Sequence, residues 1–143
     1  MKKIYLLFIL IFLNFSGYSQ TGMLNGTGYA PNFTVTDING TSHTLYDYLD
    51  SGYVTVLELL SVTCGHCIAY APGTENSYQT NGPNGTNVAR FLGLEVNSST
   101  DSTAIANFMS TYGVTMPIAD NVSPVGINYQ LYYTPSYFVV YPD

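Results

Sequence analysis

Cys64 and Cys67 are the only cysteines in the 143-residue chain, and Gly65 and His66 separate them. The pair follows an apolar run over residues 53–60 and precedes a predicted helix. Cysteines at this spacing can form and break a disulfide with little backbone movement. A disulfide that closes so short a loop would stabilise the fold little, because the entropy lost by the unfolded chain grows with loop length. The spacing therefore favours reversible disulfide chemistry.

Cys64 is expected at the start of the predicted helix. Free backbone N–H groups and the positive end of the helix dipole favour a thiolate there. A protonated His66 would favour it further, and the alternative is an exposed His66 without effect. The Cys64 thiolate would attack a substrate disulfide, and Cys67 would then attack the Cys64 sulfur and release the reduced substrate. The same steps in reverse oxidise a substrate.

Glu58 interrupts the apolar run before the cysteines. The run is nearly continuous, as in a central strand covered on both faces. Burying a carboxylate in such a strand is costly. Glu58 is therefore either partly solvated at a strand end or buried beneath the cysteine pair, where it could accept or supply the Cys67 proton.

Strand and helix patterns alternate along the chain. An Asn-Gly turn between residues 33–36 and 41–45 predicts an N-terminal hairpin, and a short helix follows it. The helix after Cys64 is expected to kink or end at Pro72. Residues 73–87 are expected to form a surface loop, with a helical continuation over 75–79 as the alternative.

A strand is predicted over residues 88–96, a short strand or loop over 116–120, and a strand over 137–141. Between the first two, residues 97–101 offer caps for a helix that ends at Gly113 and buries one face. The members of that face are Ile105, Phe108, Met109 and Tyr112. A turn of helix is expected over residues 124–129. This order predicts an α/β fold with a mostly parallel sheet.

The N-terminus has the layout of a secretory signal peptide. Lys2 and Lys3 precede an apolar stretch that is too short for a comfortable membrane span. We predict a signal peptide over residues 1–19, with an uncleaved N-terminal anchor as the alternative, a flexible lead-in over 20–29 and one folded domain over 30–143. No stable membrane span is expected after cleavage.

Cleavage would leave the mature chain strongly acidic. Arg90 would be the only strong base, and one base minus nine acids gives a net charge of −8 with His neutral. A surface this acidic does not bind nucleic acid through phosphate contacts. The charge therefore excludes a nucleic-acid partner.

Five features in register resemble the thioredoxin-like superfamily, and within it the exported thiol-disulfide oxidoreductases of the TlpA/ResA type, which are related to the AhpC/TSA redoxins. They are the opening stretch over residues 30–40, Glu58 six residues before Cys64, the Cys64-Gly65-His66-Cys67 motif, Pro72 five residues after Cys67, and Thr134-Pro135 before an apolar strand. The likeness covers roughly residues 29–143.

The resemblance implies a thioredoxin-like α/β fold, in which helices flank a mixed, mostly parallel sheet behind an N-terminal hairpin. It implies catalytic roles for Cys64, Cys67, His66, Glu58 and Pro135. Pro135 would match the family's cis-proline beside the sulfurs, and a trans turn proline is the alternative.

The resemblance also implies substrate contacts by Thr134, Gly65 and Thr63, with the Thr134 backbone free to pair with an extended substrate segment. Thr63 departs from the family, which usually has tryptophan there, so partner contacts and pocket polarity would differ. The family fold continues past its proline-led strand with another strand and a helix, whereas this chain stops at Asp143. We therefore expect a C-terminally incomplete domain, with one sheet edge and face left for the missing elements.

The implied function is thiol-disulfide oxidoreductase activity in an exported compartment, periplasmic or secreted, in a Gram-negative bacterium. The expected partners are protein thiols and disulfides together with an upstream electron donor or acceptor protein. The redox-active Cys64–Cys67 disulfide would be the only redox group, without a bound cofactor or metal.

Three alternatives stay open. A peroxiredoxin would need Pro-x-x-x-Thr-x-x-Cys, but residue 57 is leucine and residue 61 is serine. A copper-binding module could use the two cysteines, whereas a closed zinc site would need further ligands and only His43 and His66 are available. The third is a non-catalytic thioredoxin-like surface module, against which the intact cysteine motif weighs.

Overall fold

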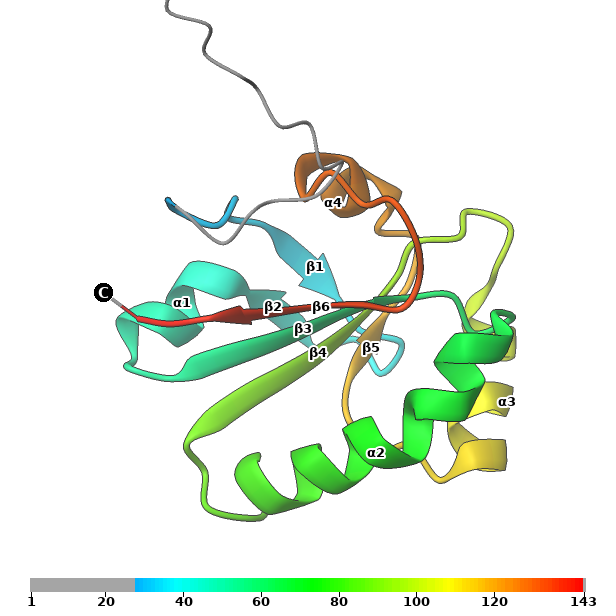
Figure 1. Cartoon of the computed structure of the whole chain (residues 1–143), viewed down its shortest axis with the longest axis horizontal. Helices are drawn as coiled ribbons and strands as arrows, with labels where there is room; N and C mark the ends of the chain where they lie inside the picture. Colours follow the sequence, from blue (N-terminus) through cyan, green and yellow to red (C-terminus); the bar gives the residue numbers. More distant parts are fainter. Residues whose placement is uncertain (1–27, 143) are drawn as a thin grey trace, which may run out of the picture.

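A four-stranded sheet in the order β5-β4-β3-β6 organises residues 28–142, the part of the chain that this computed structural model describes (Figure 1). Its strands are β3 (Val54–Leu60), β4 (Ala89–Glu95), β5 (Ile118–Ala119) and β6 (Ser136–Val140). β4 runs parallel to β3 and β5, whereas β6 runs antiparallel to β3. The predicted α/β fold with a mixed, mostly parallel sheet is confirmed. The predicted signal peptide lies outside the described residues.

The N-terminal hairpin and the helix after it are confirmed. β1 (Thr34–Thr36) pairs antiparallel with β2 (Ser42–Thr44), and α1 (Leu45–Asp50) follows. Gly40 closes the turn with a φ of 84°, a conformation that glycine adopts without steric cost. The Ile38 N–H donates to the Ile118 carbonyl at 3.0 Å, so the turn is attached to the edge strand β5.

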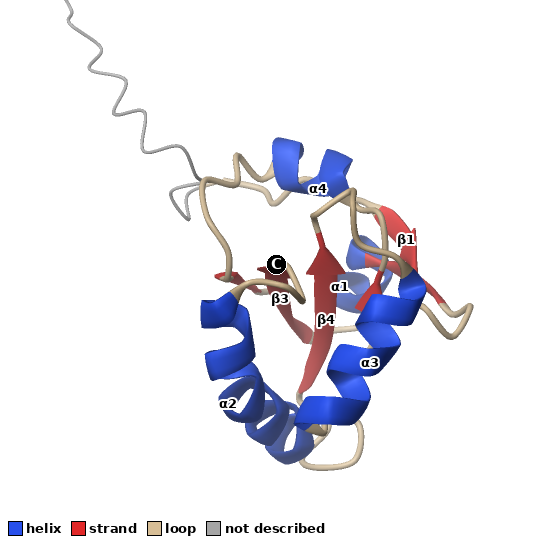
Figure 2. Cartoon of the chain, turned by 90° about the vertical axis from the view of Figure 1, so that its right-hand side faces the viewer, coloured by secondary structure: helices blue, strands red, loops and turns tan. Residues whose placement is uncertain are grey.

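The sheet separates two hydrophobic clusters, because successive side chains of a strand point to opposite faces. α2 (Gly65–Asn81) and α3 (Ser102–Tyr112) lie on the same side of the sheet (Figure 2). α1 and α4 (Ser123–Asn128) contribute Leu45 and Val125 to the cluster on the opposite face. Both faces of β3 are therefore covered, as its continuous apolar character predicts.

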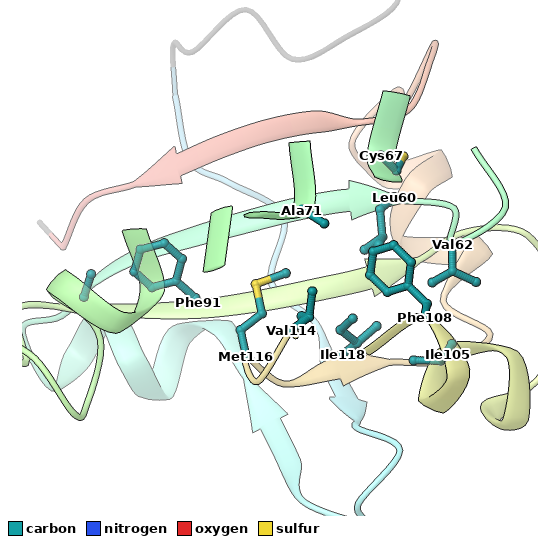
Figure 3. Close-up of a cluster of buried hydrophobic side chains, with 11 residues drawn as sticks. Leu60, Val62, Cys67, Ala71, Phe91, Ile105, Phe108, Val114, Met116 and Ile118 are labelled. Carbon is teal, nitrogen blue, oxygen red and sulfur yellow. The ribbon is translucent and has the colours of Figure 1, made fainter. Parts of the chain in front are cut away.

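The cluster beneath α2 and α3 includes one of the two cysteines (Figure 3). Its members are Leu60, Val62, Cys67, Ala71, Ala89, Phe91, Ile105, Phe108, Val114, Met116 and Ile118. Burying apolar side chains is the main favourable contribution to folding, so this packing fixes the start of α2 on the sheet. Cys67 is consequently part of the core.

α2 is longer than the sequence indicates. It continues through Pro72 to Asn81, so the predicted loop is wrong for residues 73–81. The helix changes direction along its length (Figure 1), as an internal proline explains. Tertiary contacts hold its polar second half: Glu75 accepts a hydrogen bond from the Thr115 N–H at 2.8 Å, and the Tyr78 ring packs edge-on against Phe91.

α3 begins and ends where the sequence predicts. The Asp101 side chain accepts a hydrogen bond from the Ala104 N–H at 2.8 Å, and Gly113 ends the helix in the left-handed conformation. Ile105 and Phe108 are buried, whereas Tyr112 is 38% exposed at the edge of the predicted face. Within residues 28–142, no helix combines the length and hydropathy that a membrane crossing needs.

Candidate active site

The cysteine motif lies where β3 passes into α2. Cys64 is the N-cap of α2 and is partly exposed, whereas Cys67 is 0% exposed. Both cysteines are free thiols in this structure. The helix start therefore presents one sulfur to solvent and holds the other inside.

The helix N-terminus favours the thiolate of Cys64. The backbone N–H of Cys67, the Thr134 side chain and the backbone N–H of His66 all hydrogen bond to its sulfur. These donors outweigh slight burial and lower the pKa of Cys64 from 9.0 to about 7. Near neutral pH, about half of the Cys64 side chains are thiolates.

Cys67 has the opposite character. Burial raises the pKa of its thiol to about 11, although the Ser61 N–H lies 3.5 Å from its sulfur and favours the thiolate. Cys67 therefore keeps its proton in conditions where Cys64 has lost it. The two sulfurs are suited to different steps, one to attack from solution and the other to attack from inside.

The Thr134-Pro135 segment lies beside the exposed sulfur. Its peptide bond is cis, as the resemblance implies. The Sγ of Cys64 lies 3.5 Å from the Thr134 carbonyl oxygen and can donate a weak hydrogen bond to it. The structure thus brings Cys64, Thr134 and Pro135 together from distant parts of the sequence.

The other three predicted residues of the motif region are exposed. They are Thr63, Gly65 and His66. The Thr63 hydroxyl lies 3.0 Å from that of Ser61, which fixes its side chain over the loop before α2. Within the described residues the His66 side chain makes no hydrogen bond or ion pair, and its backbone N–H is the group that reaches the Cys64 sulfur. An effect of the His66 imidazole stays a prediction.

Glu58 is the buried carboxyl of the site. It is 3% exposed, and Tyr137 from β6 donates a hydrogen bond to its Oε1 at 2.8 Å. Burial raises the pKa of Glu58 to about 7, and the Tyr137 hydrogen bond limits that rise. Of the two alternatives for this residue, the buried one is correct. No direct hydrogen bond joins Glu58 to Cys67 in the described part of the chain.

Glu95 is a second buried carboxyl, which sequence reasoning missed. It is 0% exposed at the end of β4, and its two oxygens accept hydrogen bonds from the Val62 N–H at 2.7 Å and the Asn97 N–H at 2.8 Å. Burial, together with nearby Asp120, raises the pKa of Glu95 despite these bonds. The signal was available, because Glu95 interrupts an apolar strand in the same way as Glu58 does.

Tyr137 and Thr74 were also missed. The register pairs Glu58 with Tyr137 across β3 and β6, and the Tyr137 hydroxyl lies 2.8 Å from that of Thr74 in α2. The only sequence signal is that Tyr137 opens the apolar strand after Pro135. Nothing in the sequence pairs that strand with the one that carries Glu58.

His43 lies in a separate cluster of the hairpin. Its Nε2 is 3.0 Å from Asp37 Oδ2, and its Nδ1 contacts the Tyr48 hydroxyl. Within residues 28–142, no group of three or more His, Cys, Asp or Glu side chains is placed to hold a metal ion. A zinc site built on the cysteines and His43 therefore has no support in the described residues.

The sheet order, the cysteine pair at the start of α2 and the cis-proline beside it define a thioredoxin-like fold. The AhpC/TSA family matches residues 28–143, and the chain belongs to this family. A comparison with curated protein sequences finds no match.

Solved structures of similar fold include thiol-disulfide oxidoreductases. A secreted disulfide oxidoreductase of Mycobacterium tuberculosis, homologous to E. coli DsbE, is 21% identical with a TM-score of 0.66, over 78% of this chain and 77% of that chain. The thioredoxin domain of a Bacteroides vulgatus thiol-disulfide oxidoreductase is 18% identical with a TM-score of 0.68, over 80% of each chain. StoA from Bacillus subtilis is 18% identical with a TM-score of 0.64, over 81% of this chain and 84% of that chain. At these identities the likeness establishes the shared fold.

Proposed function

We propose that this protein is a thiol-disulfide oxidoreductase that exchanges disulfides with protein substrates through Cys64 and Cys67. One observation carries the proposal: Cys64 is partly exposed at the start of α2 beside the cis Thr134-Pro135 bond, whereas Cys67 is buried in the core. These surroundings lower the pKa of the Cys64 thiol to about 7 and raise that of the Cys67 thiol to about 11. A structural pair of cysteines needs no such difference. A nucleophile and a resolving thiol need it, because only the first must attack from solution as a thiolate.

In the proposed reaction, the Cys64 thiolate attacks one sulfur of a substrate disulfide. A mixed disulfide forms, and the other substrate sulfur leaves as a thiolate. Cys67 then loses its proton and attacks the Cys64 sulfur, which forms the Cys64–Cys67 disulfide and releases the second substrate thiolate. The protein is oxidised by two electrons and the substrate is reduced by two; the reverse sequence oxidises a substrate.

Glu58 is proposed as the base for the second step. A base must take the Cys67 proton, and a carboxyl with a pKa near 7 is close to the pH at which it would work. The residues proposed to contact the substrate lie around Cys64. They are Thr63, Gly65, His66, Thr134 and Pro135. Thr134 contacts the Cys64 thiol through its carbonyl, so this contact must loosen when a substrate sulfur approaches.

We propose export as the setting of this activity, in the periplasm or outside the cell. The proposal rests on the N-terminal pattern of Lys2, Lys3 and the apolar stretch after them. The partners would be protein thiols or disulfides and a donor or acceptor protein that restores the cysteine pair. The Cys64–Cys67 disulfide would serve as the redox group without a further cofactor.

Two variants test the roles of the cysteines. Cys64→Ser should abolish disulfide exchange with a model protein disulfide, because no exposed thiolate remains. Cys67→Ser should still attack but should accumulate a mixed disulfide, visible on a non-reducing gel. Turnover that survives in Cys64→Ser would contradict the assignment.

The reduction potential of the pair, measured by glutathione equilibration, tests the proposal further. A value near or above about −180 mV indicates an oxidase or isomerase, and one near about −270 mV indicates a reductase. A pair that resists reduction far below this range would be a structural disulfide, and the proposed function would be wrong.

A further inference from the structure

A hydrogen-bonded chain leads from the interior of the site to its surface. The chain begins at the Glu58 carboxyl on β3, passes to the Tyr137 hydroxyl on β6 at 2.8 Å, and continues to the Thr74 hydroxyl on α2 at 2.8 Å. Glu58 is 3% exposed and Tyr137 is 43% exposed. The chain therefore connects a carboxyl that has almost no contact with water to a tyrosine that is partly exposed.

Strand register and the position of α2 bring these three groups together. Glu58 and Tyr137 are register partners in the antiparallel β3–β6 pair, so their side chains leave the sheet on the same face. Leu57 and Leu59 point to the opposite face, where α1 and α4 pack. α2 crosses the face that Glu58 and Tyr137 share, and Thr74 follows Pro72 in the second half of this helix.

The surroundings of Glu58 leave few other routes for a proton. Tyr137 on β6 is the titratable group that interacts both with this carboxyl and with Cys67 on α2. On the other side of β3, the residue paired with Glu58 is Gly93 of β4, which carries no side chain. Burial and the neighbouring Glu58 and Cys67 raise the pKa of Tyr137, so its hydroxyl stays protonated and can act only by passing a proton on.

We propose that Tyr137 and Thr74 form a proton relay that connects Glu58 to solvent during disulfide exchange. This inference rests on the proposed function of the cysteine pair. A substrate that covers Cys64 would also cover the start of α2, and Glu58 must still lose its proton before the next cycle. The relay provides an exit along β6 and α2, away from Cys64.

The proton balance of the relay is simple. The Cys67 thiol proton passes to the Glu58 carboxylate as Cys67 attacks the Cys64 sulfur. The Tyr137 hydroxyl, which donates to Glu58 in the structure, then turns toward Thr74. Glu58 gives a proton to the Tyr137 oxygen, the Tyr137 proton moves to Thr74, and the Thr74 proton leaves to water. Each hydroxyl ends with one proton, and one proton has left the interior. In the observed arrangement the Tyr137 hydroxyl donates to Glu58, so the Thr74 hydroxyl donates to Tyr137 and the same chain can also carry a proton inward.

A stopped-flow experiment with dithiobisnitrobenzoate separates the relay from the rest of the reaction. The reduced protein should release thionitrobenzoate in two phases. The first phase forms the mixed disulfide on Cys64, and the second forms the Cys64–Cys67 disulfide. Because the relay serves Glu58, only the second phase should depend on Tyr137.

Tyr137→Phe removes one oxygen and keeps the ring. We expect it to slow the second phase by about tenfold or more, to leave the first phase unchanged, and to shift the pH midpoint of the second phase upward, because Glu58 loses its hydrogen bond. Imidazole buffer should restore the second phase in proportion to its concentration, since a small carrier replaces the relay. Thr74→Val should give a smaller defect of the same kind. Tyr112→Phe, at a tyrosine of similar exposure on α3, is the matched control.

Two kinds of failure are distinguishable. If the wild-type protein gives no second phase, the proposed function fails and the relay fails with it. If the wild type gives both phases but Tyr137→Phe matches it, the relay alone is refuted. A slow second phase that responds to neither imidazole nor pH would show that Tyr137 is only structural, and this result would also refute the relay.

Discussion

The backbone N–H of His66, and not its imidazole, interacts with the Cys64 sulfur. The imidazole is exposed, whereas the backbone N–H hydrogen bonds to the Cys64 sulfur and helps to lower the pKa of that thiol. Donors to a thiolate stabilise the reduced form of the pair, so they also make its disulfide more oxidising. The part of residue 66 that tunes the site is therefore the part that every residue except proline shares.

Two substitutions at this position separate the two parts of the residue. His66→Pro removes the N–H, so we expect the pKa of Cys64 to rise and the reduction potential to fall. His66→Ala keeps the N–H, so we expect the pKa to stay near 7. The pH dependence of iodoacetamide alkylation, measured in a Cys67→Ser background, reports the pKa of Cys64 directly. A pKa that rises equally in both variants would assign the effect to the imidazole instead.

At the scale of elements, Glu95 attaches the loop before α2 to the end of β4. Its carboxylate accepts hydrogen bonds from Val62 and Asn97, and the Asn97 side chain reaches the Ser61 hydroxyl at 3.5 Å. The loop over residues 61–63 sets the position of Cys64, because it joins β3 to the helix that Cys64 caps. Glu95 thus positions the nucleophile without touching it.

Glu95→Gln should destabilise the fold by about 1–3 kcal/mol. Both carboxylate oxygens accept from backbone N–H groups, and in glutamine an NH2 group, which is a donor, replaces one of these acceptors. It should also slow alkylation of Cys64, since the loop loses its anchor. Urea unfolding measures the first effect and iodoacetamide kinetics the second. Asp50→Asn, an exposed acid at the end of α1, is the control. Unchanged stability in Glu95→Gln would contradict the anchoring role.

At the scale of the whole molecule, acids whose pKa is raised and acids whose pKa is lowered have opposite effects on the pH dependence of stability. The pKa of Glu58 is raised from 4.5 to about 7, so its contribution is complete below pH 4.5 and is lost as pH rises through 7. Burial also raises the pKa of Glu95, so its contribution to stability likewise decreases as pH rises. Hydrogen bonds lower the pKa values of the buried Asp37 and the half-buried Glu75, so the contributions of these two acids are lost as pH falls through the lowered values.

We therefore expect the melting temperature to be highest in mild acid, near about pH 5, and to decline toward neutral pH. The shift at Glu58 corresponds to about 3 kcal/mol, so Glu58→Gln should gain about 1–3 kcal/mol above pH 7 and flatten the decline. Calorimetry between about pH 3 and pH 9 measures the decline in the wild type and the gain in Glu58→Gln. The Cys64→Ser/Cys67→Ser background removes the titration of the thiols. An equally steep decline in Glu58→Gln would place its origin in other groups.

The sequence by itself determined the order of elements, the cysteine motif and the presence of a carboxylate, Glu58, within an apolar strand. These are local features: apolar periodicity, turn and cap residues, and spacing identify strands and helices without knowledge of their neighbours. The ends of α3 at Asp101 and Gly113 follow from caps that lie within a few residues of the helix. The second half of α2 was given only as an alternative over residues 75–79, because contacts with Thr115 and Phe91, far along the chain, hold it.

Only the tertiary structure decided which residues meet at the site. The antiparallel pairing of β6 with β3 brings Tyr137 to Glu58, and the parallel pairing of β4 with β3 brings Glu95 to the loop before Cys64. Strand register over such distances depends on how the whole core packs, and no local pattern encodes it. The difference between the two thiols has the same origin, because burial of Cys67 in the core and donors at the helix start set their pKa values.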